Sequence, residues 1–150
     1  MIIKDRLIVD MKNAMRAKDK SRLDSIRLLR ADIQRREIDA RGELNDEGVL
    51  HVIQRMIKQG KDSIELFTSG NRPDLVAKEQ ITIDVIEGYL PKQLEEAEIQ
   101  KLIDEAFYVL KPESMRDMGK VMGWLKPKLQ GKTDMGSISA SIKQRIAGIV

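Results

Sequence analysis

Apolar residues recur every three or four positions along this chain, which is the spacing of one face of an α-helix. Near the N-terminus, Ile3, Leu7, Met11 and Ala14 follow that spacing. No stretch alternates between apolar and polar residues in the way that a half-buried strand would. The pattern therefore predicts an all-α protein.

Residues typical of helix starts and ends divide this pattern into seven helices. Those expected to begin helices are Asp19 or Ser21, Asn45 or Asp46, Pro73, Ser114 with Asp117, and Asp134. Those expected to close helices are Gly42, Gly70 and Gly131. Pro127 is expected to kink or end the sixth helix. Gly60 lies inside the third helix, where it marks either close packing or a bend.

Pro91 marks the expected boundary between two parts of the chain. Proline disfavours helical geometry in the residue before it, so the fourth helix is expected to stop near Tyr89 or Leu90. The sequence thus predicts an N-terminal four-helix part over residues 1–90 and a smaller C-terminal three-helix part over residues 91–150.

Composition narrows the chemistry that is open to these helices. The chain has 150 residues, no cysteine and a single histidine, His51. Disulfides, thiolate nucleophiles and cysteine zinc sites are therefore excluded, and His51 is expected to be an ordinary residue on a helix surface. No catalytic residue, metal ligand or cofactor is predicted. Aromatic residues make up only 3% of the chain, so stacking on nucleic-acid bases is not expected.

No apolar run approaches the roughly 20 residues that a membrane span needs, and charges interrupt the N-terminal apolar stretch. We therefore expect no membrane association, and the cytoplasm as the compartment.

Charge is distributed unevenly along the chain. Residues 1–41 hold 12 Lys and Arg against 7 Asp and Glu, residues 42–90 hold 5 against 9, and residues 111–145 hold 8 against 3. A basic segment can meet phosphate backbones. A solvated helix face of mixed charge explains the same pattern, and both interpretations stay open at this point.

The segment "LQGKTD", residues 129–134, resembles the end of a phosphate-binding loop. Such a loop needs a glycine five residues before the one that precedes the lysine, and that position is Lys126. A helix containing Pro127 precedes the segment where a buried strand would be required. Asp134 would also repel a phosphate at the start of the next helix. The segment is therefore interpreted as a joint between two helices, closed by Gly131 and capped by Asp134.

Four stretches together resemble the GatB/YqeY family of small bacterial proteins. They are "MKNAMRAKDKSRLDSIRLLRADI" (11–33), "IKQGKDSIELF" (57–67), "IEGYLPKQLEEAEI" (86–99) and "MGKVMGWLKPKLQGKTD" (118–134). The resemblance covers essentially the whole chain. Two departures stand out: Gly60 occupies a position where members often have a basic residue, and Thr133 replaces a small residue.

The resemblance implies a four-helix part followed by a three-helix part that is similar to the tail of the B subunit of the tRNA-dependent amidotransferase. Similar modules are appended to some glutaminyl-tRNA synthetases, and in both settings the tail contacts tRNA. The activity attached to the family is carbon–nitrogen ligation with glutamine as amido-N-donor. The kinase-like cradle and the amidase that perform this chemistry are absent from this sequence, so the resemblance implies an accessory, tRNA-binding protein.

The resemblance gives a role to the basic residues of the last two helices and their joint. Those expected to meet tRNA phosphates are Lys120, Lys126, Lys128, Lys132, Lys143 and Arg145. Gly119, Gly123 and Gly131 would let the backbone approach the ligand closely, although Gly119 and Gly123 also suit tight helix packing. Trp124 is expected in the core or at a hinge between the two parts.

The partners implied by the resemblance are tRNA and an amidotransferase or an aminoacyl-tRNA synthetase. The alternative is a protein–protein interaction module with no catalytic or RNA-binding activity of its own.

Overall fold

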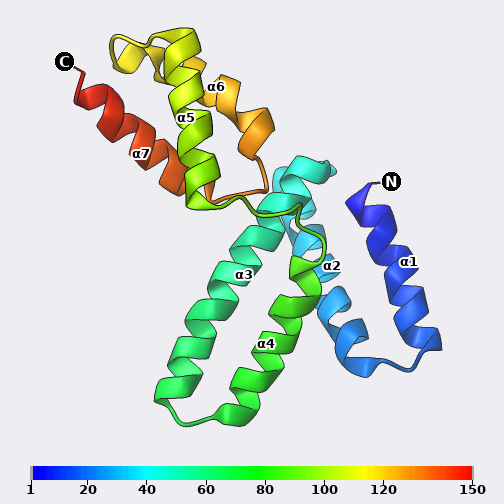
Figure 1. Cartoon of the computed structure of the whole chain (residues 1–150). Coiled ribbons are helices and arrows are strands. Elements are labelled where there is room, and N and C mark those ends of the chain that lie inside the picture. The colour runs from blue at the N-terminus through cyan, green and yellow to red at the C-terminus, as the bar shows by residue number, and fades with distance from the viewer. Residues whose placement is uncertain (1, 150) are drawn as a thin grey trace. The chain divides into compact units, whose positions relative to one another are not determined.

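The computed structural model describes residues 2–149, and within them it contains seven α-helices, one short 3-10 helix and no strand (Figure 1). The prediction of an all-α protein is therefore confirmed. The contacts of the chain group into two compact units, Met1–Leu90 and Pro91–Val150.

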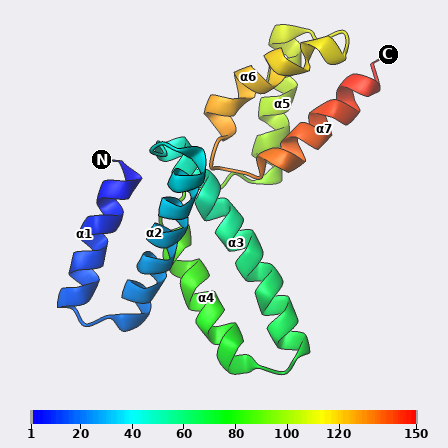
Figure 2. The ribbon, with the colours of Figure 1, turned by 180° about the vertical axis from the view of Figure 1, so that it is seen from behind.

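The first unit consists of α1 (Ile3–Arg16), α2 (Lys20–Ala40), α3 (Asp46–Ser69) and α4 (Pro73–Glu87). Consecutive helices form two antiparallel hairpins, α1 with α2 and α3 with α4, and α2 packs on α4 between them (Figure 2). The fully buried side chains that join the four helices include Leu7, Ile26, Leu29, Ile53 and Ile86. Most positions of the predicted apolar stripes therefore face one common core.

Side-chain caps start α2 and α3 where the sequence predicts them. Asp19 accepts a hydrogen bond from the backbone N–H of Arg22 at 3.2 Å, and Asn45 accepts one from Gly48 at 3.0 Å. Pro73 occupies the first turn of α4. These three predicted starts are confirmed, because capping depends on residues that are close in sequence.

The end of α2 differs from the prediction. The helix stops at Ala40, and the residue in left-handed geometry is Arg41, with φ of 54°. Gly42 instead donates its N–H to the carbonyl of Glu37 at 3.1 Å. The prediction that Gly42 itself closes the helix is therefore wrong by one position. Gly70 does close α3, but Asn71 takes the left-handed conformation there, with φ of 55°.

Gly60 lies where α3 packs closely against α4. It is buried, and a Cβ atom at this position would lie 3.0 Å from both Ile83 Cδ1 and Glu79 Oε1. Of the two interpretations of Gly60, close packing is therefore the one that the structure supports.

Tyr89 ties the segment after α4 to α1. Its hydroxyl donates to Asp10 Oδ2, and the Arg6 guanidinium lies 5.0 Å from the centre of its ring. Only 5% of Tyr89 is exposed. Burial, and then the hydrogen bond to Asp10, raise the pKa of the Tyr89 hydroxyl above its ordinary value. The last residues of the first unit are thereby anchored to its first helix, although α4 itself ends at Glu87, slightly earlier than predicted.

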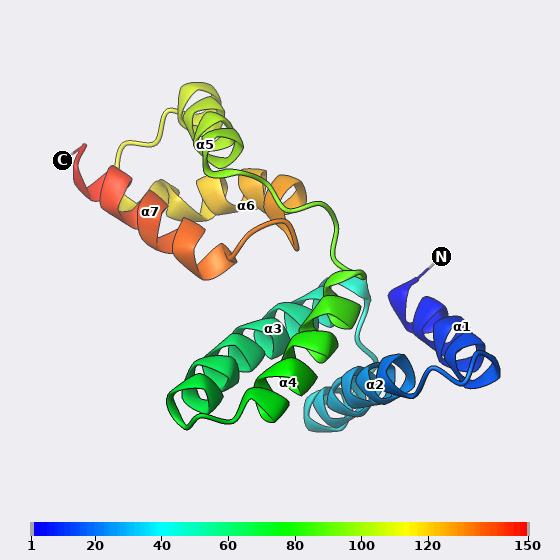
Figure 3. The same ribbon diagram turned by 60° about the horizontal axis from the view of Figure 1, so that its bottom comes forward.

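The second unit consists of α5 (Glu96–Leu110), the 3-10 helix η1 (Met115–Asp117), α6 (Met118–Leu129) and α7 (Met135–Ala147). The three α-helices surround a separate core, and α6 packs against both α5 and α7 (Figure 3). Its buried side chains include Ile103, Val121, Leu125, Leu129 and Ile142.

Two details of this unit depart from the sequence expectations. Of the two outcomes expected at Pro127, a kink or the end of the helix, the end does not occur there, because α6 continues to Leu129. A proline inside a helix removes the hydrogen bond to the carbonyl four residues earlier, which belongs to Gly123, and Gly123 is exposed to solvent. The spacing of Ile138, Ile142, Ile146 and Ile149 predicts one buried stripe on the last helix. Ile149 instead lies beyond the end of α7 and is 50% exposed, so the last position of that predicted stripe is wrong.

Candidate nucleic-acid interface

The "LQGKTD" segment is a joint held by the start of the second unit. Gly131 is buried and has φ of 76°, a left-handed geometry that favours glycine. The Gln93 side chain donates to the Gly131 carbonyl at 2.7 Å, and the Leu94 N–H donates to the Lys132 carbonyl at 3.0 Å. The "YLPKQL" and "GKTD" motifs thus touch each other, which explains structurally why both occur in one chain.

Asp134 caps α7 as predicted. Its carboxylate accepts hydrogen bonds from the Gly136 N–H and the Ser137 hydroxyl, each at 3.0 Å. The interpretation of "LQGKTD" as a helix–helix joint is therefore confirmed. Lys132 is half-buried at this joint, whereas the other five predicted phosphate-binding residues are exposed.

The outer face of α6 brings several predicted site residues together. At about 100° per residue, the face opposite the buried stripe of Val121, Leu125 and Leu129 is centred on two glycines with a lysine on either side. In order around the helix, its exposed residues are Lys126, Gly119, Gly123, Pro127 and Lys120. We call these five residues the α6 face.

The two glycines of the α6 face do not serve helix packing. Both are exposed, and a Cβ atom added to Gly119 or Gly123 would meet no atom within 4 Å. The packing interpretation of these glycines is therefore wrong, because they point away from the core that α6 shares with α5 and α7. Their backbone is open to a ligand from outside the unit.

Lys128 lies beside the α6 face rather than on it. Its Nζ lies 3.8 Å from the centre of the Trp124 ring. Trp124 is half-buried and packs against the core of the second unit, as expected for a core residue. This cation–π contact keeps the ammonium close to the helix surface on the Lys120 side of α6.

The two predicted residues of α7 point to different sides of that helix. Two positions along a helix correspond to about 200° of rotation, so Lys143 and Arg145 cannot share a face. Arg145 donates to Asp104 on α5, and its guanidinium lies 4.4 Å from the centre of the Phe107 ring. Its charge is thus already met within the protein, which sequence spacing could not reveal.

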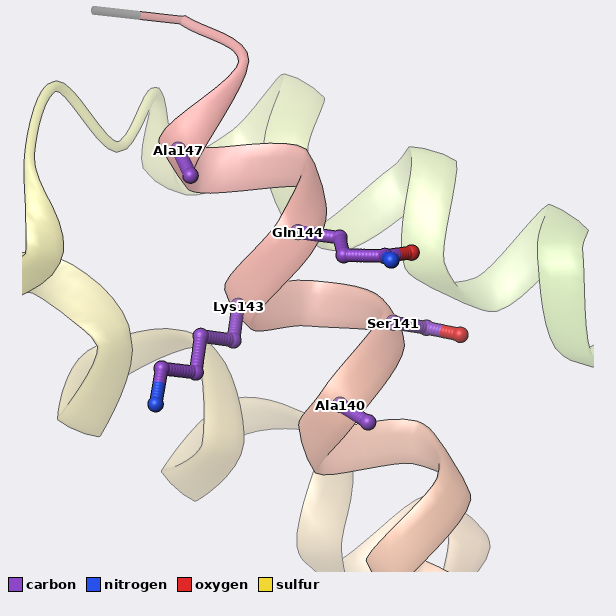
Figure 4. Close-up of a pocket in the computed structure, with 5 residues that line it drawn as sticks. All are labelled: Ala140, Ser141, Lys143, Gln144 and Ala147. Carbon is purple, nitrogen blue, oxygen red and sulfur yellow. The ribbon is translucent and has the colours of Figure 1, made fainter.

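Lys143 borders a shallow hollow on the outer side of α7 (Figure 4). Ala140 and Ala147 are among the residues that line it, and Lys143 leaves the helix on the opposite side from Ser141 and Gln144. The structure therefore separates the six predicted cations into the α6 group, the joint at Lys132, and two distinct positions on α7.

Arg116 is a further cation near the α6 face that the sequence prediction left unnamed. It is exposed on η1, three residues before Gly119. The neighbouring Asp117 accepts hydrogen bonds from the N–H groups of Glu113 and Ser114, which hold the pKa of its carboxyl below the usual value. The spacing of three residues from Gly119 is the signal that could have identified Arg116.

The described part of the chain shows no metal site and no membrane span. Residues 2–149 contain no group of three or more His, Asp or Glu side chains placed to hold a metal ion. His51 is exposed on α3, as expected. No helix within the same residues is long and apolar enough to cross a membrane.

A sequence model of the family described as "Yqey-like protein" matches residues 4–146, almost the entire chain. The chain belongs to the YqeY-like family. Relatives of this YqeY-like chain include fungal proteins named "Altered inheritance of mitochondria protein 41, mitochondrial". The one from Pyrenophora tritici-repentis is 36% identical over 146 residues, which cover 95% of the chain and 80% of the relative.

Two further fungal relatives carry the same name. The Lachancea thermotolerans protein is 37% identical over 140 residues, covering 89% of this chain and 75% of its own length. The Saccharomyces cerevisiae protein is 34% identical over 150 residues, which cover 93% of this chain and 80% of the relative. These YqeY-like relatives are mitochondrial by name, so the expected cytoplasmic location is not confirmed.

Proposed function

We propose that this YqeY-like protein is a tRNA-associated accessory factor whose second unit binds the RNA phosphate backbone through the α6 face. The observation that carries the proposal is the open backbone at Gly119 and Gly123 between the ammonium groups of Lys120 and Lys126. No contact within the described residues explains two glycines in the middle of an exposed helix face.

The physical argument starts from how RNA is recognised. Double-helical RNA is bound mainly through its shape and its phosphates, which suits a surface with lysines and few aromatic residues. Because glycine has no side chain, a phosphate strand can approach the axis of α6 at Gly119 and Gly123. Lysines on both sides of the strand can then reach its phosphates, and Lys128 extends the same positive surface.

The two units are proposed to act as separate domains, residues 1–90 and 91–150. Tyr89 is anchored to α1, and Gln93 is anchored to Gly131. Only Leu90, Pro91 and Lys92 lie between these anchors. In this arrangement the four-helix domain and the three-helix tail are joined by a very short connection.

The proposed partners follow from the likeness of the second unit to the amidotransferase tail. A tRNA bound there would be shared with an amidotransferase or an aminoacyl-tRNA synthetase. We assign no catalytic residue, and we expect the purified protein to show no glutamine-dependent amidation of mischarged tRNA. The cytoplasm is the proposed compartment, and cell fractionation would show whether this chain instead follows its mitochondrial relatives.

Charge reversal on the α6 face tests the proposal. The variant carries Lys120→Glu and Lys126→Glu, and a control carries Lys58→Glu and Lys61→Glu at exposed positions of α3. Both variants change the net charge equally. Fluorescence anisotropy with labelled tRNA is expected to show a tenfold or greater rise in Kd for the α6 variant alone. Equal Kd values for the two variants would remove the α6 face as the binding site.

A second candidate function, a protein–protein interaction module, is favoured by exposed apolar side chains at the end of α5. Tyr108 is 80% exposed and Val109 is 55% exposed, and Met115 on η1 is also exposed. Crosslinking in cells, followed by sequencing of bound RNA and mass spectrometry of bound proteins, separates the two functions. Recovery of one protein partner without RNA would favour the interaction module.

A further inference from the structure

The α1–α2 hairpin carries a second concentration of positive charge. Within residues 12–30 there are seven basic residues and only two acidic ones, Asp19 and Asp24. All seven basic residues are exposed, and they are Lys12, Arg16, Lys18, Lys20, Arg22, Arg27 and Arg30. Asp19 is already used to cap α2. We call these seven residues the hairpin cluster.

The hairpin cluster lacks the carboxylate partners that other cations of the protein have. Lys4 pairs with Glu37 at 2.8 Å, and Arg72 pairs with Asp74 at 3.0 Å. Within residues 2–149, no salt bridge involves a side chain of the hairpin cluster. Arg30 donates only to the neutral sulfur of Met11, at 3.1 Å. Seven like charges without salt bridges repel each other.

The cluster forms a row on each helix of the hairpin. On α2, Lys20, Arg27 and Arg30 lie within about 80° of one another around the axis, on the side away from the core. On α1, Lys12 and Arg16 lie within about 40° of each other, also facing outward. The contact of Arg30 with Met11 shows that the row on α2 borders α1. The two rows therefore belong to one hairpin.

We propose that the hairpin cluster is a second binding site for the phosphate backbone of RNA. The ten steps from Lys20 to Arg30 span about 15 Å of helix, at about 1.5 Å per residue. Phosphates follow one another by about 3.4 Å per strand along a duplex axis, so the row on α2 reaches several of them. The choice of RNA as the ligand rests on the function proposed for the α6 face.

An anionic membrane fits the hairpin less well than RNA does. A helix that lies in a membrane surface separates its apolar and charged residues onto opposite faces. On α1 the exposed Val9 shares the outward face with Lys12 and Arg16, so insertion of that face would bury charges. RNA phosphates require no such insertion.

Two sites in one short-linked chain would reinforce each other. Only three residues connect the anchor at Tyr89 to the anchor at Gln93. Once one site holds an RNA, the other site meets the same molecule at high effective concentration. A variant that loses either site therefore also loses this reinforcement. Its affinity for RNA is expected to fall by more than the isolated affinity of the lost site would suggest.

The test uses the full chain with three pairs of substitutions. The hairpin variant carries Lys20→Glu and Arg27→Glu, the α6 variant carries Lys120→Glu and Lys126→Glu, and the control carries Lys58→Glu and Lys61→Glu. Circular dichroism melting confirms that each variant is folded. Binding of labelled tRNA and of a blunt RNA duplex is expected to fall tenfold or more in the hairpin variant and to stay near wild type in the control.

The outcomes separate this inference from the function proposed for the α6 face. Normal RNA binding by the hairpin variant, with loss in the α6 variant, overturns the inference and leaves the α6 proposal standing. Loss of RNA binding in the hairpin variant, with normal binding by the α6 variant, supports the hairpin site and removes the α6 site. Absence of RNA binding by the wild-type chain overturns both. Binding to phosphatidylserine vesicles that the hairpin variant loses, while its RNA binding is retained, makes a membrane the ligand and also overturns the inference.

Discussion

Gly60 in the interior of α3 and Gly119 in the first turn of α6 have opposite surroundings. Gly60 is buried, and a Cβ atom there would press on Ile83 at 3.0 Å. Gly119 is exposed, and a Cβ atom there would meet nothing within 4 Å. Glycine in a helix interior, as at Gly60, costs about 1 kcal/mol relative to alanine. At Gly60 the close contact of α3 with α4 offsets that cost, whereas at Gly119 no internal contact does.

Glycine is unfavourable in a helix, so its surroundings indicate why it is there. Where packing explains the residue, its role is in the fold. Where packing does not explain it, a ligand from outside is the remaining physical reason to leave the backbone bare. This comparison supports the α6 face as a binding surface, and it can be tested by changing each glycine separately.

The largest expected effect is from Gly60→Leu. The larger side chain cannot fit between α3 and the buried Ile83 without displacing the core, so we expect a loss of about 3 kcal/mol in the free energy of unfolding. Urea denaturation measures it, with Gly119→Leu as the matched control. A loss of the same size in Gly119→Leu would break the comparison, because it would show that Gly119 also serves packing.

Two contacts between a cation and an aromatic ring give the same comparison for side chains, one in the first unit and one in the second. In one the ring of the buried Tyr89 meets Arg6, and in the other the ring of the half-buried Trp124 meets the exposed Lys128. Tyr89→Phe removes the hydrogen bond to Asp10 and is expected to cost about 2 kcal/mol of unfolding free energy. Lys128→Gln is expected to change stability by less than about 1 kcal/mol. Thermal or urea unfolding of both variants checks the difference.

Tyr89 should also make stability depend on alkaline pH. Its pKa is raised in the folded protein, so the neutral hydroxyl is the form that the fold favours. Below the ordinary tyrosine pKa of about 10 this contribution is fully present, and above it the unfolded chain ionises first and the contribution falls. Wild type should therefore lose more stability than Tyr89→Phe between neutral pH and pH values above about 10. If the free energy of unfolding fell equally with pH in wild type and in Tyr89→Phe, this role of Tyr89 would be contradicted.

Gly119→Leu is expected to weaken RNA binding although it leaves the fold intact. A leucine at this position would keep a phosphate strand away from the backbone of α6. We expect Kd for tRNA to rise about tenfold, which corresponds to about 1.4 kcal/mol. An unchanged Kd would mean that the lysines act without the bare backbone between them.

The smallest expected effect is a gain in stability. Gly119→Ala adds a better helix former where nothing obstructs the new methyl group, so the free energy of unfolding should rise by about 0.5 kcal/mol. Gly60→Ala serves as the contrast, because its methyl group would press on Ile83. Equal gains in both variants would remove the distinction between the two glycines.

Much of the fold could be predicted because helix patterns and caps are local. Asp19, Asn45 and Asp134 each cap a helix through residues two or three positions away. The error at Gly42 also has a local cause, since Arg41 adopts the left-handed geometry one position earlier. The helix does not end at Pro127, because the carbonyl that this proline frees lies on an exposed face, where the helix can continue.

The candidate site was predictable only as a set of lysines. Their exposure follows from the helical pattern, but the partner of Arg145 does not, because Asp104 lies 41 residues earlier on another helix. The role of Gly119 and Gly123 depends on what surrounds α6 in three dimensions. The absence of salt bridges in the hairpin cluster likewise depends on where the Asp and Glu side chains lie in the folded protein, which the sequence does not give.

The most direct test of the central claim is the salt dependence of tRNA binding by the wild-type chain and by the Lys120→Glu, Lys126→Glu variant. Each phosphate contact contributes about 0.7 to 0.9 to the slope of log affinity against log salt concentration. We predict a steep decline for wild type and a slope shallower by about 1.5 for the variant. Identical slopes for the two proteins, or wild-type binding that salt does not affect, would contradict the claim that the α6 face binds RNA phosphates.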